Sequence, residues 1–330
     1  MDLLRALLDP VQSSVFESLV LPALHYFGFM AYADDAYDAT GHVVLAAVEL
    51  LALYLLLRPL EAWRPVERWA DRRGVRADVV YTLLERSGAL PLLFFLVLQP
   101  LLGPFEIALR AAGYLPPNLE DVFPGLATQP LAAFLVYLIV IDFFEYWRHR
   151  FQHRFNWWWA LHATHHSQRY MSFWADDRNH VLDSLIEALW LSLLALVIGV
   201  APAQFVAIVF TMRLVENLSH ANLRLSFGRV GERLLVSPRY HRVHHGIGVG
   251  HEGQARGCNF ATLFPVWDVL FGTANFSPIY PATGIRDQLD GADYGNGFLD
   301  QQWSGMRRLW RALRPPRVGR VLAGASRWSR

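Results

Sequence analysis

The stretch HRFQHRFNWWWALHATHH, residues 149–166, holds five histidines at helical spacing. Residues three or four positions apart lie on one face of an α-helix, so this spacing can present several imidazoles together. A further group of three histidines repeats the HxxHH spacing later in the chain. The histidines of these motifs are His149, His153, His162, His165, His166, His241, His244 and His245. Because imidazole is a common metal ligand, the pattern predicts a polyhistidine metal centre.

The apolar segment at residues 131–148 is nearly long enough to cross a bilayer, and it ends where the first histidines begin. It carries Asp142 and Glu145 on the helical face of His149. Ionisable residues within a membrane helix are costly and usually face a functional interior. Metal-bound imidazoles usually donate their other N–H to a carboxylate or carbonyl. We therefore expect Asp142 and Glu145 to hold the metal-binding imidazoles in place.

The apolar block at residues 184–219 determines whether all the histidines share one side of the membrane. As a single span, it would place His180 and His220 on opposite sides. Gly199 and Pro202 interrupt it near the middle, and each half of about 17 residues would form about 25 Å of helix. We therefore predict a helical hairpin that returns His220 to the side of His180, and both become candidate ligands.

Three earlier apolar segments complete the predicted membrane region. Residues 12–31 could cross the bilayer or lie in its interface, whereas residues 42–60 and 79–102 are predicted to cross it. A turn-rich connection reaches to about residue 130. Arginines gather at the end of the 42–60 segment and in the loop after it: Arg58, Arg64, Arg68, Arg72, Arg73 and Arg76. By the positive-inside rule this loop is cytoplasmic, and so is the face that carries the histidines.

The second HxxHH motif lies in a segment with helix start and stop signals. Ser237 can cap the helix, Pro238 suits its first position and Gly246 can end it. The result would be a short helix that presents three imidazoles. His251 lies in a Gly-rich segment, and we expect that it is not a ligand. The tryptophans at 157–159 are expected to anchor the chain at the membrane interface.

The composition narrows the chemistry of the predicted site. The chain has 330 residues, 53% of them hydrophobic, with a net charge of +1 and a single cysteine. The single cysteine excludes a thiolate zinc site and an iron–sulfur cluster. The net charge is too small to give an electrostatic field that attracts nucleic acid. Ten candidate histidines exceed the three protein ligands of a hydrolytic zinc site. They suit two ions with about five imidazoles each, which leads us to infer iron and O₂ activation.

Several short motifs together resemble the fatty acid hydroxylase/sterol desaturase superfamily, over about residues 131–275. The matching segments are Asp142-Phe-Phe-Glu-Tyr-Trp-Arg-His149-Arg-Phe-Gln-His153, His162-Ala-Thr-His165-His166-Ser, Arg178-Asn-His180, His220-Ala-Asn222, His241-Arg-Val-His244-His245-Gly, Asn259-Phe and Trp267-Asp268-Val-Leu-Phe271-Gly272-Thr273. The resemblance implies an all-α integral membrane protein with about four to five transmembrane or re-entrant helices. It also implies a cytosolic helical cap that holds a polyhistidine dimetal site.

The resemblance further implies a non-haem diiron oxygenase that uses O₂ to hydroxylate or desaturate an aliphatic lipid. The lipid could be sterol-like, a fatty acyl chain, a carotenoid or an ether lipid. Position by position, the implied ligands are His149, His153, His162, His165, His166, His180, His220, His241, His244 and His245, with zinc possible in isolated protein. Supporting roles would fall to Asp142, Glu145, Asn222 and Asn259. The single cysteine excludes a CxxC redox motif, and we expect electrons from a ferredoxin or cytochrome b5-type donor with its reductase.

These expectations divide the chain into three regions and leave one alternative open. Residues 1–130 would form N-terminal membrane helices, 131–275 the catalytic domain and 276–330 a basic cytoplasmic tail, which is either solvated or bound to anionic lipid. The expected location is the cell inner membrane, with the site on the cytoplasmic side and no nucleic-acid partner. The alternative is a non-catalytic membrane protein that binds metal or transfers electrons. The sequence does not determine the oligomeric state.

Overall fold

The computed structural model describes residues 2–251 and 257–314, and this part of the chain is built from helices and loops. Its only β-type pairing is an isolated antiparallel bridge between Gly246 and Thr283. The structure thus confirms the all-α class. Four helices are long and apolar enough to cross a membrane: Met30–Trp63, Ala89–Ala111, Pro130–Arg154 and Val181–Ile198. The chain is an integral membrane protein.

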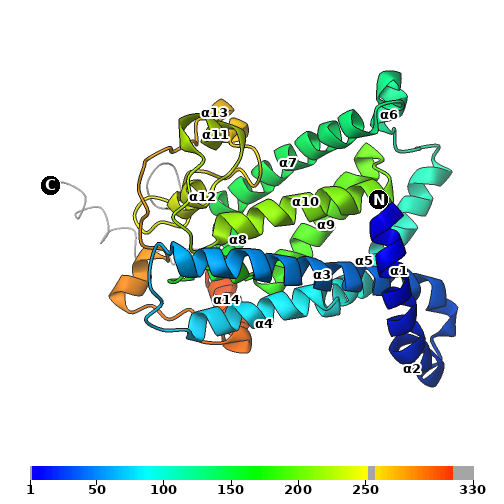
Figure 1. The fold of residues 1–330 in the computed structure, drawn as a ribbon, viewed down its shortest axis with the longest axis horizontal. Coiled ribbons are helices and arrows are strands. Elements are labelled where there is room, and N and C mark those ends of the chain that lie inside the picture. Colours follow the sequence, from blue (N-terminus) through cyan, green and yellow to red (C-terminus); the bar gives the residue numbers. More distant parts are fainter. Residues whose placement is uncertain (1, 252–256, 315–330) are drawn as a thin grey trace.

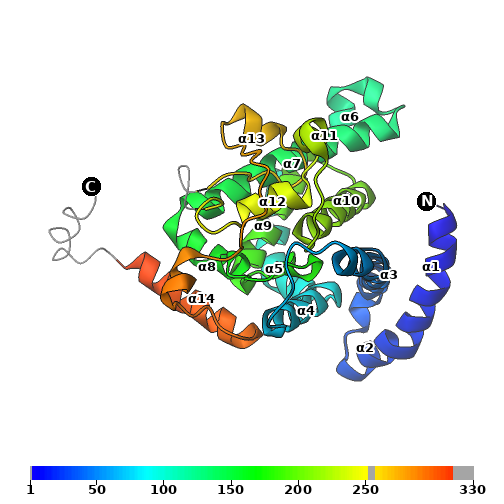
Figure 2. The same cartoon turned by 60° about the vertical axis from the view of Figure 1, so that its left-hand side comes forward.

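The first helices lie beside the main bundle at the N-terminal end (Figures 1 and 2). Helix α1 (Asp2–Val15) continues through a π-helical turn (Phe16–Val20) into α2 (Leu21–Phe27). A 3-10 turn (Met30–Tyr32) then leads into the long helix α3 (Ala33–Trp63). The predicted crossing at 42–60 lies within α3.

The predicted crossing at residues 79–102 is divided between two helices. The structure has α4 (Arg73–Arg86) and α5 (Ala89–Ala111), separated at Ser87 and Gly88. Gly88 has a φ of 82°, a left-handed conformation that glycine adopts without steric cost. The break separates two environments. Helix α4 buries Asp78, Thr82 and Arg86, whereas α5 is almost entirely apolar.

The interrupted block after residue 180 forms the predicted hairpin. Helix α9 (Val181–Ile198) ends at Gly199, which has a φ of 63°, and α10 (Pro202–His220) returns beside it (Figure 1). The hairpin packs against α7 (Pro130–Arg154) through a shared apolar core that includes Ile141 and Ile208. His220 therefore lies at the end of the bundle from which α9 starts.

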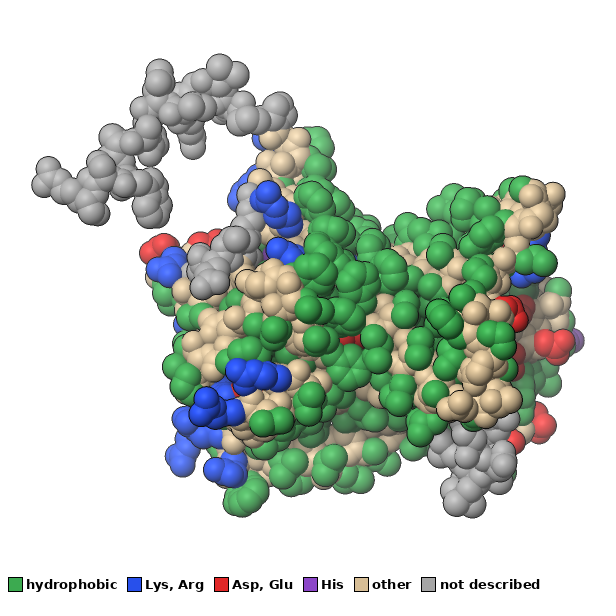
Figure 3. All heavy atoms as spheres, turned by 90° about the horizontal axis from the view of Figure 1, so that it is seen from above, with side chains coloured by type: hydrophobic (Ala, Val, Ile, Leu, Met, Phe, Trp, Pro, Cys, Tyr) green, Lys and Arg blue, Asp and Glu red, His purple; other side chains and the backbone are tan. Residues whose placement is uncertain are grey.

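The remaining helices are short, and most of them cover one end of the bundle. In chain order they are α6 (Leu119–Val122), a 3-10 turn (Pro124–Leu126), α8 (Asn156–His166), a 3-10 turn (Phe173–Ala175), α11 (Gly228–Leu234), α12 (Pro238–His244), α13 (Val266–Leu270), a 3-10 turn (Arg286–Asp290) and α14 (Phe298–Leu313). Helices α8, α11, α12, α13 and α14 form a cap at the end opposite α6 (Figure 1). Apolar side chains cover much of the bundle surface, and arginines gather at the cap end (Figure 3).

Part of the predicted C-terminal tail is an ordered helix. Helix α14 packs on α8 (Figure 2) and buries Gln301 and Gly305. Its exposed side carries Leu299, Trp303 and Trp310. The spacing of these apolar residues is that of an amphipathic helix, and the opposite side of the helix packs on α8. The tail prediction for residues 315–330 lies outside the described residues.

Candidate metal centre

Nine of the ten predicted ligands come together where the ends of α7, α8, α10 and α12 meet. One group consists of His149, His153, His162, His166 and His244, and a second consists of His165, His220, His241 and His245. All nine are buried, and in each group the nitrogens that could bind a metal lie within 4.8 Å of one another. Five and four imidazoles in two adjacent groups are a donor set for two metal ions.

The hydrogen bonding within these groups fits two bound cations. The Nδ1 atoms of His220 and His244 lie 2.8 Å and 2.7 Å from the backbone oxygens of Glu216 and Cys258. A carbonyl oxygen only accepts, so each Nδ1 carries the proton and each Nε2 offers a lone pair. His244 Nε2 nevertheless lies 3.1 Å from the Nε2 of His166, and His220 Nε2 lies 3.2 Å and 2.9 Å from those of His165 and His241. A cation would satisfy these converging lone pairs together.

Other buried nitrogens in the two groups also lack a hydrogen-bond partner. They are both ring nitrogens of His153, Nε2 of His162, and Nδ1 of His165, His166, His241 and His245. A buried polar atom without a partner is costly, and a bound cation would satisfy Nε2 of His162 and one ring nitrogen of His153. Burial lowers the pKa of His165, His166, His241 and His245 well below the usual value, and lowers that of His244 to about 3. The imidazoles are therefore neutral at pH 7, as metal binding requires.

A backbone segment after α12 holds two of the imidazoles from outside. Cys258 O accepts from His244 Nδ1, and Phe260 O accepts from His149 Nδ1 at 2.8 Å. Asn259 between them has a φ of 58° and is the only non-glycine residue with a positive φ in the described chain. Its side-chain amide donates to Tyr240 O and Asn275 O. This left-handed residue lies between the two carbonyl groups that face the histidines.

The predicted role of Asp142 differs from the observed one. Its carboxylate accepts hydrogen bonds from Thr262, Trp267 and two backbone N–H groups of the 263–264 segment, and from no histidine. Asp142 therefore affects the imidazoles only through this segment. Glu145 forms an ion pair with Arg148 at 2.6 Å. Helical spacing alone could not predict the partners of Asp142, because the segment that binds it is 120 or more positions away in the sequence.

The carboxylate that does contact an imidazole directly is Asp183, which the sequence analysis missed. Its Oδ2 lies 3.1 Å from His162 Nδ1, while Oδ1 accepts from Gln152 and from Trp158 Nε1 at 2.7 Å. The sequence feature that could have identified Asp183 is its position three residues after His180, in the first turn of α9. Asp176 adds a second such contact, with Oδ1 3.3 Å from His220 Nδ1.

His180 is the one predicted ligand that the structure does not bring to either group. Its Nε2 lies 2.9 Å from Gln302 O, and its Nδ1 accepts from Leu182 N at 3.2 Å. Both ring nitrogens are thus engaged, because the residue caps α9 and joins it to α14. The ring of His251 lies 5.4 Å from that of His166, outside both groups as they are defined above.

Asn222 and the tryptophans also have positions that the sequence did not predict. Asn222 accepts from the backbone N–H groups of Val66 and Glu67 and thus ties the end of α10 to the loop after α3. The expectation of interface anchors is wrong for Trp158 and Trp159. Trp158 is buried against Asp183, and the Trp159 ring lies 5.0 Å from that of His153.

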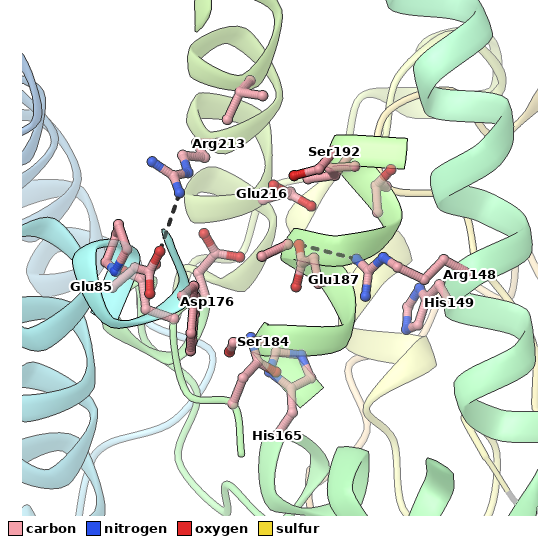
Figure 4. Close-up of a pocket in the computed structure, with 18 of the residues that line it drawn as sticks. Glu85, Arg148, His149, His165, Asp176, Ser184, Glu187, Ser192, Arg213 and Glu216 are labelled. Carbon is pink, nitrogen blue, oxygen red and sulfur yellow. Dashed lines mark hydrogen bonds and ion pairs between the residues drawn. The ribbon is translucent and has the colours of Figure 1, made fainter. Parts of the chain in front are cut away.

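A cavity of about 460 Å³ extends from the histidines into the helical bundle. Its walls come from α5, α7, α9, α10 and the segment before α9, and Figure 4 shows its polar end. His149, His162, His165, His220 and His241 line that end. Towards the membrane interior the walls are apolar, with Phe94, Leu98, Leu102, Leu191 and Phe205. A molecule with an aliphatic chain could lie here with one end against the imidazoles.

The helical bundle and its paired histidine groups define a membrane protein with a candidate dimetal site. Residues 134–273 match the fatty acid hydroxylase family model. This match and the relatives below confirm the resemblance to that family that was drawn from the motifs.

Lipid-modifying enzymes are among the similar proteins. Alkylglycerol monooxygenase from Danio rerio is 33% identical over 138 residues, which are 42% of this chain and 29% of that protein. The human alkylglycerol monooxygenase is 32% identical over 136 residues, or 40% and 28% of the two chains. Ornithine lipid hydroxylase OlsE from Rhizobium tropici is 26% identical over 283 residues, or 81% and 78%. The match thus spans less than a third of the alkylglycerol monooxygenases. No solved structure gives a significant match.

The names of these relatives are those of lipid-modifying oxidoreductases.

Proposed function

We propose that this chain is a diiron oxygenase that hydroxylates a membrane lipid, with O₂ as co-substrate. The observation that carries the proposal is the pair of buried imidazole groups at the end of a lipid-sized cavity. Nine residues would hold the two ions: His149, His153, His162, His166 and His244 around one, and His165, His220, His241 and His245 around the other. His180 is left out of this set because both its ring nitrogens are hydrogen bonded.

Two bound irons would supply the capacity to activate O₂ and to insert one of its oxygen atoms into an unactivated C–H bond. Zinc could take the same positions in isolated protein without supplying this redox chemistry. The absence of thiolates is compatible with either metal, because neutral imidazole binds both.

The chain's own residues would position the lipid and the imidazoles. The apolar walls formed by α5, α9 and α10 bind an aliphatic chain and exclude water from it. Asp183 fixes the ring orientation of His162 and increases the basicity of its free Nε2. Carbonyl groups of Cys258 and Phe260 fix the rings of His244 and His149 in the same way.

Hydroxylation is the reaction that the names of the relatives favour over desaturation. One group of relatives is named for monooxygenation of alkylglycerols and another for hydroxylation of ornithine lipids. Since the match to the ornithine lipid hydroxylase covers most of both chains, we propose a polar membrane lipid as the substrate. Ether cleavage after hydroxylation is the corresponding outcome for an alkylglycerol.

The proposed orientation places the histidine cap in the cytoplasm, at the inner membrane. The support is the gathering of arginines at the cap end, which follows the positive-inside rule (Figure 3). A ferredoxin or a cytochrome b5-type protein with its reductase would deliver electrons from that side. With a single cysteine, the chain has no CxxC redox motif of its own.

Lipid mass spectrometry of cells with and without the protein tests the proposed reaction. We expect a lipid whose mass rises by 16, the mass of one oxygen atom, and whose modified form disappears in the His165→Ala and His244→Ala variants. A lipid whose mass falls by two would instead indicate that the reaction is desaturation. Identical lipid profiles with and without wild-type protein, under conditions where it is loaded with iron and a donor is present, would overturn the proposal.

A further inference from the structure

Helix α14 packs on α8 with one side and exposes an apolar stripe on the other. The members of this stripe follow one another at intervals of three or four residues, so they lie on one face of the helix. They are Leu299, Trp303, Met306, Trp310 and Leu313, with exposed fractions between 39% and 79%. A contiguous exposed apolar face of this kind marks contact with a protein or a membrane.

The inner side of α14 is joined to the cap by specific hydrogen bonds. Arg308 donates to Ala160 O at 3.0 Å and to Thr164 Oγ1 at 2.8 Å, and both acceptors belong to α8. Gln302 donates through Nε2 to the hydroxyl oxygen of Tyr81 in α4, at 3.0 Å. These contacts fix the rotation of α14 about its own axis, so the apolar stripe must point outward.

A contact with α9 fixes the height of α14 relative to the membrane. Gln302 Oε1 accepts from the backbone N–H of Val181, the first residue of α9, at 2.8 Å. Helix α9 is one of the four candidate spans, and its 18 residues form about 27 Å of helix. Because the hydrocarbon core of a bilayer is about 30 Å thick, α9 can cross it only if Val181 lies at its boundary. The middle of α14 therefore lies at the membrane surface.

Helix α14 also runs in the direction expected of a helix that lies in the membrane surface. It crosses the direction of α3 and α10 instead of following it (Figure 1), and it lies at the outer edge of the cap, beside α8 and α4 (Figure 2). Since α3 is long and apolar enough to cross the membrane, a helix that runs across its direction lies in the plane of the bilayer. The outward side of α14 therefore faces the lipids around the bundle.

Arginines flank the apolar stripe on one side only. With about 100° of rotation per residue, Arg307, Arg311 and Arg314 all lie about 60–120° from Leu299 in the same direction round the helix. Asp300, on the same flank, is the only acidic residue of the helix, and the other flank carries no charged side chain. An apolar face with a basic flank is typical of a helix bound at the membrane interface, where arginines meet lipid phosphate groups.

Two further helices of the cap expose apolar side chains at the same level of the bundle. Helices α11 and α13 lie on the side of the cap opposite α14 (Figure 1). They expose Val230, Leu234, Val269 and Leu270. Contact with a second copy of the chain would cover one side of the cap, whereas lipids surround all of it. The distribution of exposed apolar residues therefore favours the membrane as the partner of α14.

We propose that α14 is an interfacial helix that binds the lipid leaflet on the cap side of the membrane. Its apolar stripe inserts among the acyl chains, and Arg307, Arg311 and Arg314 contact lipid phosphate groups. Because Arg308 bonds α14 to α8, which carries four of the clustered histidines, this contact holds the histidine cluster at a fixed depth relative to the lipids. The inference does not depend on which reaction the histidine cluster performs.

Spin labels on the full-length protein, in nanodiscs of phosphatidylcholine and phosphatidylglycerol, test this contact. A nitroxide would be attached at Met306→Cys in the apolar stripe and at Arg311→Cys on the basic flank, which is the matched control on the same helix. Leu96→Cys, at an exposed position of the candidate span α5, gives the value for lipid. Cys258 is 3% exposed and should not react, so the wild-type chain is the labelling control. Collisions with O₂, which enters the bilayer, are compared with collisions with chromium oxalate, which stays in water.

We expect the ratio of O₂ collisions to chromium oxalate collisions at Met306 to approach the ratio at Leu96. It should exceed the ratio at Arg311 at least about threefold, because an interfacial helix buries its apolar face about 5–10 Å deep. Trp303→Cys repeats the measurement one turn away on the same stripe and should give the same result. A stripe label that meets chromium oxalate as often as the Arg311 label would overturn the proposal. So would a stripe label shielded from both reagents, as in a contact between two copies of the chain.

Discussion

Asp183 Oδ2 lies 3.1 Å from His162 Nδ1, and this is the carboxylate–imidazole contact on which the histidine cluster depends most directly. Asp183 is 1% exposed and also binds Gln152 and Trp158, so its position is fixed from two further sides. Such a contact selects the tautomer of the imidazole and turns its other nitrogen toward the metal. It joins α9 to α8, and the sequence motifs of these two helices did not predict a contact between them.

Replacement of Asp183 by Asn should therefore weaken metal binding more than it changes the fold. The amide keeps the size of the side chain but loses the charge that increases the basicity of His162. We expect metal affinity to fall by about 10- to 100-fold, measured by competition with a chelator. Asp71→Asn is the control, because Asp71 is exposed and contacts only Arg73. An affinity equal to that of wild type would remove Asp183 from the site.

The left-handed backbone at Asn259 gives a second prediction. Asn259→Ala should lower the free energy of unfolding by about 2 kcal/mol, because alanine tolerates a φ of 58° poorly and the side-chain hydrogen bonds are lost. Asn259→Gly loses the same hydrogen bonds but relieves the backbone, so it should be the more stable of the two variants by about 1 kcal/mol. Thermal unfolding in detergent measures both. The reverse order would contradict the role given to the backbone conformation.

The fold and the ligand pattern could be predicted from the sequence because both follow from helical periodicity. The hairpin at 184–219 was predictable because glycine and proline interrupt the apolar block. The division of the ligands between two groups could not be predicted from the sequence. His165 and His166 are adjacent in sequence but belong to different groups, since successive residues on a helix point about 100° apart.

Contacts between distant segments could not be predicted. Asp142 was expected to contact an imidazole, but the loop after Asn259 lies between them, and Asp183 makes the direct contact. His180 resembles a ligand in sequence, yet its partner Gln302 lies 122 positions away in a helix that was expected to be a tail. A single sequence holds no signal for such pairings, because they depend on how whole helices pack.

The contact between α14 and α9 gives a third prediction. A side chain at Gly305 would overlap the imidazole ring of His180, so Gly305→Ala should separate the two helices. We expect a loss of about 1–3 kcal/mol in stability, seen as a lower unfolding temperature. Gly297→Ala serves as the control, because a Cβ at that position meets open space. If both variants unfold at the wild-type temperature, α14 does not pack as described.

Acidification should destabilise the metal-free protein. The pKa of His244 is lowered to about 3 by burial, and those of His165, His166, His241 and His245 are also well below their usual value. An unfolded chain gains protons on these residues below about pH 6.5, whereas the folded chain does not. Stability should therefore be constant above pH 7 and fall from about pH 6.5 towards pH 3. Thermal unfolding of chelator-treated protein between pH 8 and 4 measures this, and a rise in stability on acidification would contradict it.

The number and identity of the metal ions per chain test the central claim most directly. We would measure them by mass spectrometry of protein purified under iron-replete conditions, with His25→Ala as a control for a histidine outside the two groups. The expected result is about two irons per chain for wild type and the control, and a clear loss in both His165→Ala and His166→Ala, which affect different groups. Iron-free protein with a single bound zinc, or full iron loading in both variants, would contradict a diiron centre at these histidines.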